Sequence, residues 1–436
     1  MKITIPKIMP GFMELLPEDQ ILFNEMVDTI RNTYEKFGFL PLDTPILELS
    51  EVLLAKAGGE TEKQIYRFKK GENDISLRFD LTVPLARYAS QRYHDLVFPF
   101  KRYQIGKVYR GERPQKGRFR EFYQCDIDVI GEDLSTIYDA EIPMIIYELF
   151  KNLNFGKFTI RINNRKVLNG LFESLNLNDK SSEVLRIIDK IEKIGKEEVK
   201  KELTLLGIKD TSIDQIINFI EIKGSNNEVI KSLKNLKINN DLFTTGLQEL
   251  EQVINYLNDF GLDESFYKID LTIARGLDYY TGTVYETMLN DYPNLGSICS
   301  GGRYDNLTSY YTDKKLKGVG ISIGLTRLFY QLKEAGIINS KKKTLSKVLV
   351  VPFDNKNMSY AIKVATYLRE NNINSDIYYE EKSFKSKLKY ANRQGIPYIC
   401  IIGEDEEKEG KVTLKNMETG EQELVNFEEL VNFIKW

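Results

Sequence analysis

The chain has 436 residues, of which 42% are hydrophobic and 29% are charged, and its 61 lysines and arginines against 64 aspartates and glutamates give a net charge of −3. This length suggests two or three globular domains, each large enough to bury a core. The near-neutral balance argues against a wholly basic nucleic-acid coat protein, yet it leaves room for local basic patches that attract phosphate.

Cysteine and histidine usage limits the possible chemistry. Cys125, Cys299 and Cys400 lie more than a hundred residues apart, so neither a zinc knuckle nor a disulfide framework is readable. The only histidine, His94, excludes every two-histidine metal site and disfavours Ser-His-Asp and Cys-His mechanisms. We therefore expect no metal site made by His or Cys, and no catalytic role for His94, which is expected at a helix-to-strand turn.

The start of the chain, MKITIPKIMP, is too polar for a signal peptide. No apolar run approaches the ~18–20 residues that a membrane span needs. We therefore expect a cytoplasmic protein with no membrane contact.

The first third of the chain predicts a helix and then strands. Apolar spacing favours a helix over residues 12–38, and the prolines at 41 and 45 then favour an extended segment. Residues 65–68 and 75–79 flank the turn-rich sequence KKGEND and predict a hairpin. Two longer strands, 97–109 and 119–130, flank a polar loop at 111–118. Such short connections predict an antiparallel sheet.

Residues 134–260 are predicted to be mostly helical, because stretches such as SSEVLRIIDKIEKIGKEEV carry an apolar stripe and a charged face. Strands over 269–274 and 283–288 would then resume the sheet, and a helix is expected over 325–335. After a charged linker at 341–343, alternating strands and helices predict a small, mostly parallel α/β domain.

The most informative segment is residues 101–120, which holds eight cations, five of them arginines, and one acid, Glu112. Forked guanidinium groups suit phosphate oxygens and stay charged when partly desolvated. A solvated hairpin rim would explain an ordinary charge run. Here two aromatic-rich strands bracket the loop and would hold its arginines at one end of a rigid sheet, so we predict polyphosphate binding. The eight cations are Lys101, Arg102, Lys107, Arg110, Arg113, Lys116, Arg118 and Arg120.

The second of these strands has two unlike faces, because alternate residues of a strand share a face. The odd positions, such as Cys125 and Ile127, form an ordinary core face. The even positions 122, 124, 126 and 128 hold one aromatic, one amide and two carboxylates, which are costly to bury unless they meet solvent or a polar ligand. Beside a phosphate-binding loop, we interpret the even face as the floor of a small-molecule site.

Three later segments continue this pattern. RGLDYYTGTVYE (275–286) and CSGGRYDNL (299–307) combine arginine, glycine and tyrosine, although such turns are often only structural. The sequence GVGISIG (318–324) permits close backbone approach and precedes Arg327, which can reach back to an anion. Its spacing differs from the dinucleotide-binding fingerprint, and no GxxxxGK[ST] occurs, so the usual phosphate loops are absent.

Together these segments resemble the class II aminoacyl-tRNA synthetases, and among them the histidyl-tRNA synthetase family, over nearly the whole chain. The segment YEKFGFLPLDTP (34–45) with Glu48 resembles the first motif of the class. YRGERPQKGRFREFYQ (109–124) resembles the second motif, and residues 318–328 resemble the third. These class motifs are moderately specific, whereas RGLDYY together with SGGRYD is highly specific for one amino acid.

The resemblance implies an α+β catalytic domain built on an antiparallel sheet, with a helical insertion, followed by a C-terminal α/β anticodon-binding domain. The expected boundaries are 1–166 and 263–340 for the catalytic domain, 167–262 for the insertion and 341–436 for the C-terminal domain. It also implies a homodimer that activates histidine with ATP, carrying Mg²⁺ on the phosphates, to histidyl-adenylate and pyrophosphate. The histidine then passes to the 3′ end of tRNA(His).

The resemblance further implies residue roles around ATP. Arg110 would hold the α-phosphate and the carboxylate of the amino acid, and Glu112 and Phe122 would read and stack the adenine. Arg118 and Arg327 would hold the γ-phosphate.

For histidine, the resemblance implies that Asp80, Thr82 and Gln124 bind the α-amino group, and that Asp128 and Tyr280 hydrogen-bond the imidazole, with Tyr279 beside them. Many bacterial members carry glutamate where Asp80 and Asp128 stand, so the pocket is expected to sit slightly closer. Arg275 would be the catalytic arginine at the α-phosphate, acting with Arg110 and Gln124.

For tRNA, the resemblance assigns the acceptor end to Arg113 and Gln115 and the anticodon to the C-terminal domain. There the sequence KSFKSKLKYANR (382–393) has five cations, no acid and two aromatics, which suits single-stranded bases. The candidates are Lys385, Lys389 and Arg393, and a solvated amphipathic helix is the alternative.

Three other functions stay open on the sequence. One is a catalytically inactive paralogue, the regulatory subunit of the first enzyme of histidine biosynthesis; such paralogues typically lose the RGLDYY arginine and the C-terminal domain, both present here. The second is another synthetase of the same subclass, such as a threonyl, prolyl or glycyl enzyme. The third is a plain tRNA-binding module, which would not turn over ATP.

Overall fold

The computed structural model describes residues 3–55, 60–113, 116–273 and 280–434. It divides into two compact units, one made of Met1–Met13 and Met26–Ile338 and the other of Glu14–Glu25 and Asn339–Trp436. Within the described ranges, no helix has the length and apolarity needed to cross a membrane.

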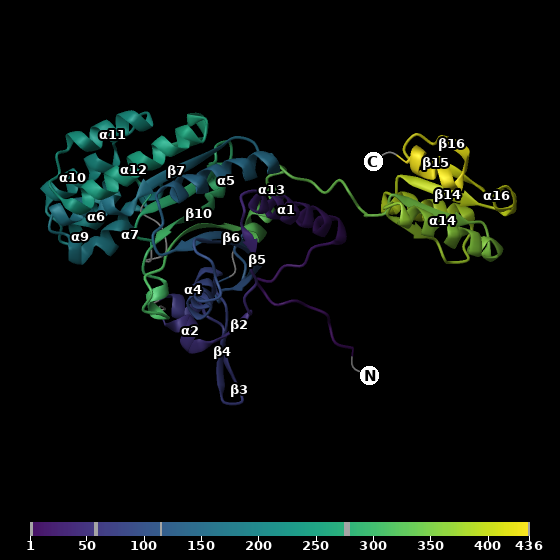
Figure 1. Cartoon of the computed structure of the whole chain (residues 1–436), viewed down its shortest axis with the longest axis horizontal. Coiled ribbons are helices and arrows are strands. Elements are labelled where there is room, and N and C mark those ends of the chain that lie inside the picture. The colour runs from purple at the N-terminus through teal and green to yellow at the C-terminus, as the bar shows by residue number, and fades with distance from the viewer. Residues whose placement is uncertain (1–2, 56–59, 114–115, 274–279, 435–436) are drawn as a thin grey trace. The chain divides into compact units, whose positions relative to one another are not determined.

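The first unit is built on an eight-stranded sheet in the order β1-β5-β6-β11-β10-β9-β7-β8 (Figure 1). All neighbours are antiparallel except the pairs β1–β5 and β7–β8, which are parallel. In sheet order the strands are β1 Leu40–Pro41, β5 Phe100–Tyr109, β6 Glu121–Gly131, β11 Lys317–Gly324, β10 Ser297–Tyr304, β9 Thr283–Leu289, β7 Phe158–Asn164 and β8 Tyr267–Ile269.

Helices α1 (Pro17–Lys36) and α5 (Ile137–Leu153) hydrogen-bond to the sheet. The hydroxyl of Tyr34 on α1 donates to the carbonyl of Cys125 on β6, and the hydroxyl of Tyr285 on β9 donates to the carbonyl of Asp139 on α5. Among the odd residues of β6, Cys125, Ile127 and Val129 are fully buried, as predicted, whereas Tyr123 is partly buried. The opposite, even face of β6 is thereby left for the site.

A buried ion pair also joins α5 to the sheet. The guanidinium of Arg303 on β10 donates from Nε to the carboxylate of Asp139 at 3.0 Å, and both side chains are almost completely buried. Breaking such a pair by removing one partner typically costs about 3–5 kcal/mol. The arginine of the SGGRYD segment therefore anchors the sheet to α5.

A three-stranded antiparallel sheet, β2-β4-β3, stands beside the large one, and the predicted hairpin is its β3–β4 pair. The chain leaves it at Leu77 and enters helix α4 at Thr82, so that the short connection between them carries Asp80. The elements here are β2 Leu47–Leu49, α2 Ser50–Leu54, α3 Glu60–Gln64, β3 Arg67–Lys70, β4 Asn73–Leu77 and α4 Thr82–Gln91.

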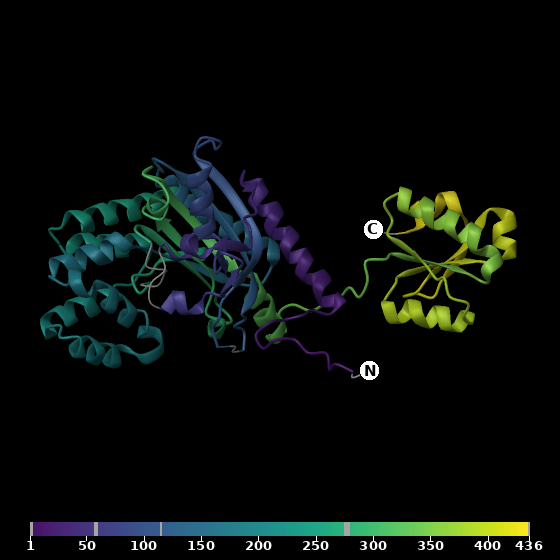
Figure 2. The same cartoon turned by 90° about the horizontal axis from the view of Figure 1, so that it is seen from below.

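A group of helices follows β7 and forms one cluster in Figures 1 and 2, drawn in teal. Its helix α12 lies very close to α6: a Cβ built on Gly170 would stand 2.4 Å from the backbone nitrogen of Phe243, and one on Gly246 2.7 Å from that of Val167. The helices are α6 Arg165–Ser174, α7 Ser181–Ile188, α8 Ile191–Ile194, α9 Lys196–Leu205, α10 Asp210–Ile220, α11 Asn226–Asn235 and α12 Asp241–Asp259.

The second unit contains a five-stranded sheet in the order β13-β12-β14-β15-β16, with one apolar cluster on each side. Its first three strands are parallel and its last two antiparallel. The elements are β12 Val348–Pro352, α14 Met358–Glu370, β13 Ser375–Ile377, α15 Phe384–Gln394, β14 Tyr398–Ile402, α16 Glu404–Glu409, β15 Lys411–Asn416, β16 Gln422–Asn426 and α17 Leu430–Phe433.

The structure confirms the antiparallel sheet, the hairpin, the helix after GVGISIG (α13, Leu325–Glu334) and the order of strands and helices at the C-terminal end. The strand predicted over 269–274 is wrong: β8 ends at Ile269, because the side chain of Asp270 accepts from the backbone nitrogen of Thr272 and closes a turn. The mostly helical prediction for 134–260 missed β7, and the first helix begins at Pro17 rather than residue 12.

Candidate active site

A cavity of about 420 Å³ opens over the even face of β6. Its lining comes from strands β6, β11, β10 and β9, the start of α13, the loop before β6 and the connection that enters α4. Ten of the residues predicted from the sequence line it: Asp80, Thr82, Arg110, Glu112, Arg118, Phe122, Gln124, Asp128, Tyr280 and Arg327.

The other predicted residues lie elsewhere. Arg113 is exposed and does not line the cavity. Gln115, Arg275 and Tyr279 fall outside the residues that the structure describes. In the second unit, Lys385, Lys389 and Arg393 are exposed and stand four residues apart on α15.

The strand register explains how the acidic end of the cavity is built. Asp128 on β6 pairs with Arg102 on β5 and with Gly320 on β11. A Cβ on Gly320 would stand 2.3 Å from Oδ1 of Asp128, and a Cβ on Gly318 would stand 2.2 Å from the ring of Tyr304. The glycines of GVGISIG therefore make room for a carboxylate and a tyrosine ring.

Asp128 is held from two sides. Its Oδ2 lies 2.6 Å from Nη2 of Arg102, and its Oδ1 accepts a hydrogen bond of 2.8 Å from the hydroxyl of Tyr304. Burial raises the pKa of Asp128 to about 6, while Arg102 and the Tyr304 hydrogen bond act in the opposite direction. The carboxylate is suited to accept a hydrogen bond from an N–H group of a ligand in the cavity.

Asp126, two residues earlier on the same face, is 1% exposed. Burial raises its pKa to about 7; the charges of Asp128 and Asp80 also raise it, whereas Arg102 and the Ser322 hydroxyl lower it. Its Oδ1 has no hydrogen-bond partner among the described residues. Asp126 does not line the cavity.

A second acidic position lies beside the first. Asp80 accepts at Oδ1 from the backbone nitrogen of Val83 at 3.0 Å, and burial raises its pKa. Gln124 donates from Nε2 to the hydroxyl of Ser322. Oδ2 of Asp80 and Oε1 of Gln124 are buried without a hydrogen-bond partner in the described part of the chain. Such oxygens can accept from an ammonium group, because buried acceptors are normally paired.

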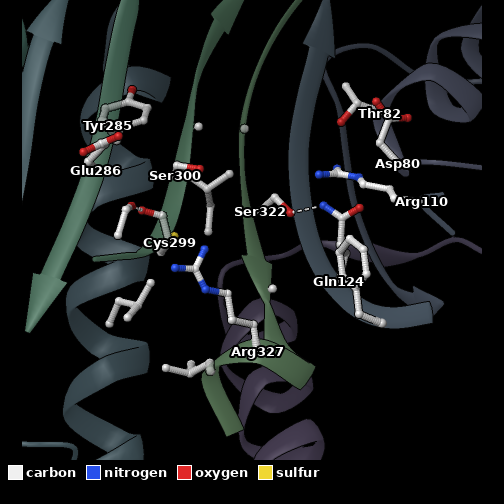
Figure 3. Close-up of a pocket in the computed structure, with 18 of the residues that line it drawn as sticks. Asp80, Thr82, Arg110, Gln124, Tyr285, Glu286, Cys299, Ser300, Ser322 and Arg327 are labelled. Carbon is white, nitrogen blue, oxygen red and sulfur yellow. Dashed lines mark hydrogen bonds between the residues drawn. The ribbon is translucent and has the colours of Figure 1, made fainter. Parts of the chain in front are cut away.

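Figure 3 shows the arrangement of these groups. Asp80, Thr82 and Arg110 gather on one side of the bond between Gln124 and Ser322, Glu286 lies on the other side, and Arg327 reaches up from α13.

The remaining arginines form a cationic region. Nε of Arg110 donates to the carbonyl of Phe79 at 3.1 Å, and its guanidinium lies 5.2 Å from the centroid of the Phe122 ring. Arg118 lies 3.6 Å from Glu112, and Nη2 of Arg327 donates to the carbonyl of Leu295. The cavity thus joins an acidic end, suited to an amine and a ring N–H, to a cationic end suited to phosphates.

Several lining or supporting residues were not found from the sequence, among them Arg102 as a partner of Asp128, and Tyr304, Ser322 and Glu286. Neither β10 nor β11 was predicted as a strand, because their glycines weaken strand propensity. Without their register, no signal indicated which of their side chains face the cavity. No group of three or more His, Cys, Asp or Glu side chains arranged for a metal occurs among the described residues.

The buried carboxyl of Asp126 predicts a pH-dependent stability difference. Its folded pKa of about 7 lies above the ordinary aspartate value of 3.8, so its favourable contribution is present below the unfolded pKa and is lost as the pH rises through 7. We expect the gain in unfolding free energy from Asp126→Asn to grow by about 2 kcal/mol between about pH 5.5 and about pH 8, measured by urea unfolding.

The matched control is Asp133→Asn, which changes an aspartate whose side chain is 99% exposed just beyond β6. We expect no pH-dependent gain from it. Equal gains from Asp126→Asn at both pH values would show that Asp126 is not the buried acid described above.

Comparisons with known proteins identify the family of the chain. The histidyl-tRNA synthetase family model matches residues 11–328, and the anticodon-binding-domain model matches residues 347–436. The histidine–tRNA ligase of Clostridium tetani is 65% identical over 435 residues, covering 99% of each chain, and that of Finegoldia magna is 47% identical over 99% of each.

Solved structures give the same result. The histidyl-tRNA synthetase from Nostoc sp. PCC 7120 superposes with a TM-score of 0.91 at 44% identity, covering 100% of this chain and 99% of that one. An ATP phosphoribosyltransferase regulatory subunit/histidyl-tRNA synthetase from Bacillus halodurans C has a TM-score of 0.76 at 22% identity over 92% of this chain and 100% of that one, a likeness of fold alone. The predicted fold class, a class II catalytic domain followed by an anticodon-binding domain, is confirmed. On its motifs, its site and these matches, the chain belongs to the histidyl-tRNA synthetase family.

Proposed function

We propose that this enzyme is an ATP-dependent histidine–tRNA ligase that forms histidyl-adenylate and pyrophosphate and then transfers histidine to the 3′ end of tRNA(His). The observation that supports it most directly is the pairing, in one cavity, of a buried acidic end at Asp80 and Asp128 with a cationic end at Arg110, Arg118 and Arg327. A reaction that consumes tRNA and ATP is expected to take place in the cytoplasm.

The acidic end suits the amino acid. The unpaired oxygens of Asp80 and Gln124 would accept from its α-ammonium group, with Thr82 beside them. Asp128 and Tyr280 would then meet the imidazole. An apolar ring of similar shape offers no N–H, so it would leave the remaining acceptor capacity of Asp128, beyond that used by Arg102 and Tyr304, without a donor in the cavity. This difference would select histidine.

The cationic end suits the transfer of the adenylyl group. The histidine carboxylate attacks the α-phosphorus in line while pyrophosphate leaves, so negative charge must be held where it develops. Arg110 and Arg275 would hold the α-phosphate, and Arg118 and Arg327 the γ-phosphate. Mg²⁺ would arrive bound to the ATP phosphates. Glu112 and Phe122 would contact the adenine.

The first test is pyrophosphate exchange into ATP, run with each of the twenty amino acids and saturating Mg²⁺. We expect exchange with histidine alone. Exchange with another amino acid would refute the specificity. No exchange, with tRNA binding retained, would support the inactive paralogue or a plain tRNA-binding module.

In the same assay, Arg275→Ala is expected to leave histidine binding largely intact and to slow adenylate formation at least about 100-fold, because it removes a cation from the transition state. Single-turnover quenching measures this rate. A near-normal rate would remove Arg275 from the mechanism.

For the second unit, we infer that α15 contacts the anticodon. Its exposed cations Lys385, Lys389 and Arg393 lie on the helix that begins at Phe384. The ring of Phe384 stacks on that of Phe353 with centroids 5.0 Å apart, and Phe353 is 56% exposed. Exposed rings next to cations suit single-stranded bases. By contrast, Lys387 on the same helix is buried and donates to the carbonyl of Pro352 at 2.6 Å, so it serves the fold.

We expect Lys389→Glu and Phe353→Ala each to raise the KM for tRNA about 10-fold or more, by loss of a phosphate contact or a stacking surface, while histidine-dependent pyrophosphate exchange stays unchanged. Lys363→Glu, on helix α14 at the opposite face of the five-stranded sheet, is the control for charge alone. An unchanged KM for tRNA in both variants would contradict an anticodon role for α15.

We also infer a homodimer. The segment of the first class motif exposes apolar side chains that a second copy would cover: Leu40, Ile46, Leu47 and Leu49. Sedimentation velocity at micromolar concentration is expected to give twice the mass of the chain, and Leu47→Glu is expected to shift the population to the monomer. A monomer in the unchanged protein would refute this. We keep the domain boundaries 1–166, 167–262, 263–340 and 341–436 as part of this proposal.

A further inference from the structure

Arg102 is the most deeply buried charge of the site. Its side chain is 0% exposed, its Nη2 lies 2.6 Å from Oδ2 of Asp128, and the same nitrogen donates to the carbonyl of Leu81 at 3.2 Å. Its Nε and Nη1 are buried and have no hydrogen-bond partner in the described part of the chain. Arg102 does not line the cavity. Whatever it contributes to the site must therefore act through Asp128 and its neighbours.

The charges around Arg102 do not balance. Asp80, Asp126 and Asp128 are 3%, 1% and 3% exposed, and the charge of Arg102 lowers the pKa of all three, whereas Arg110 acts on Asp80 from the cavity. Even if an ammonium group neutralises Asp80, two adjacent carboxylates share one guanidinium. A buried carboxylate without a cation takes up a proton rather than stay charged.

Charged and titratable groups face Asp128 from several elements. Arg102 faces it from β5, Asp126 from its own strand, and Tyr304 from β10. Asp80 adds a negative charge from the connection before α4, and Tyr280 lies next to Tyr304 ahead of β9. On β11 the opposing residue is Gly320, which brings no charge. Arg102 is therefore the cation that favours the ionised form of Asp128.

We propose that Arg102 is a positioning residue for the imidazole ring of histidine: it keeps Asp128 ionised and oriented to accept the ring N–H, while Asp126 is the carboxyl of the pair that takes up the shared proton. This inference rests on the proposed function. In this proposal, Arg102, which lies outside the cavity lining, sets the charge state of Asp128, and recognition of the ring depends on that charge state.

The structure gives Asp126 and Asp128 these different roles. Asp128 has both oxygens paired, with Arg102 and with the Tyr304 hydroxyl, whereas Oδ1 of Asp126 has no partner among the described residues. The pKa of Asp126, about 7, is accordingly above that of Asp128, about 6. Loss of Arg102 would raise the pKa of Asp128 further. A protonated Asp128 would then be a weaker acceptor for the ring N–H near neutral pH.

The test compares Arg102→Leu, which removes the charge, with Arg102→Lys, which keeps it. In pyrophosphate exchange we expect Arg102→Leu to raise the KM for histidine at least about 10-fold while the KM for ATP changes less than about twofold. The acid limb of kcat/KM for histidine should move up by about one pH unit. Arg102→Lys should keep the acid limb within about half a pH unit of the unchanged enzyme. Titration calorimetry with histidine, without ATP, should give the same order of affinities.

The matched control is Arg303→Leu. Arg303 lies on β10 of the same sheet, forms another buried ion pair with Asp139 of α5, and does not line the cavity. This variant should lower the melting temperature and leave both the KM for histidine and the acid limb unchanged. Should that variant fail to fold, Arg303→Lys replaces it.

A second variant keeps the proposal testable if Arg102→Leu alone does not fold. Adding Asp126→Asn removes one carboxylate together with the cation, so Asp128 is left paired to Tyr304 without a charged neighbour on its strand. We expect Arg102→Leu/Asp126→Asn to fold and to keep the raised KM for histidine and the raised acid limb expected of Arg102→Leu, because Asp128 still lacks its cation.

The outcomes distinguish a failure of the proposed function from a failure of the role of Arg102. Failure of the unchanged enzyme to exchange pyrophosphate with histidine would overturn the proposed function. Normal exchange, with an unshifted acid limb and an unchanged KM for histidine in Arg102→Leu, would overturn the role of Arg102 alone. A double variant that folds with the acid limb and the KM for histidine of the unchanged enzyme would also overturn it.

Discussion

The structure of the site depends on one cross-strand row, in which Arg102, Asp128 and Gly320 lie in register on three neighbouring strands. A carboxylate can be buried there because a guanidinium compensates its charge, a tyrosine hydroxyl donates to its other oxygen, and a glycine leaves it space. A side chain at Gly320 would overlap Asp128, and one at Gly318 would displace the tyrosine that holds it. The row therefore couples strand register directly to the chemistry of the pocket.

The large sheet also explains why the cavity has two ends of opposite charge. One face of β6 packs toward the core and contains apolar residues such as Ile127, so its alternate residues must all face the cavity side. Along that side, Asp128 and Gln124 lie within the sheet, whereas Arg110 stands just past the end of β5, where the basic loop begins. A rigid sheet keeps these charges apart and in place before any ligand arrives, which is the condition for stabilising charge without reorganisation.

Fold alone would not identify the activity. The regulatory subunit/synthetase from Bacillus halodurans C shares this fold at 22% identity, and fold by itself does not specify function. Particular side chains support an active ligase. The acidic residues Asp80 and Asp128 line one end of the cavity, and arginines of the second class motif line its other end. Catalysis by positioned charges also fits a chain whose single histidine, His94, lies exposed in the turn between α4 and β5.

The sequence by itself determined the family, part of the order of the elements and, through the motifs that resemble the family's, ten of the residues that line the cavity. Strand alternation independently placed Phe122, Gln124 and Asp128 on one face of a strand. Only the tertiary structure decided which residues support them. Arg102 reads as one more cation of a basic segment, and Tyr304 as part of a glycine-rich turn, until the registers of β5, β10 and β11 bring both to Asp128. Pairing between strands nearly two hundred residues apart is a long-range property, set by the packing of the whole sheet rather than by any local pattern.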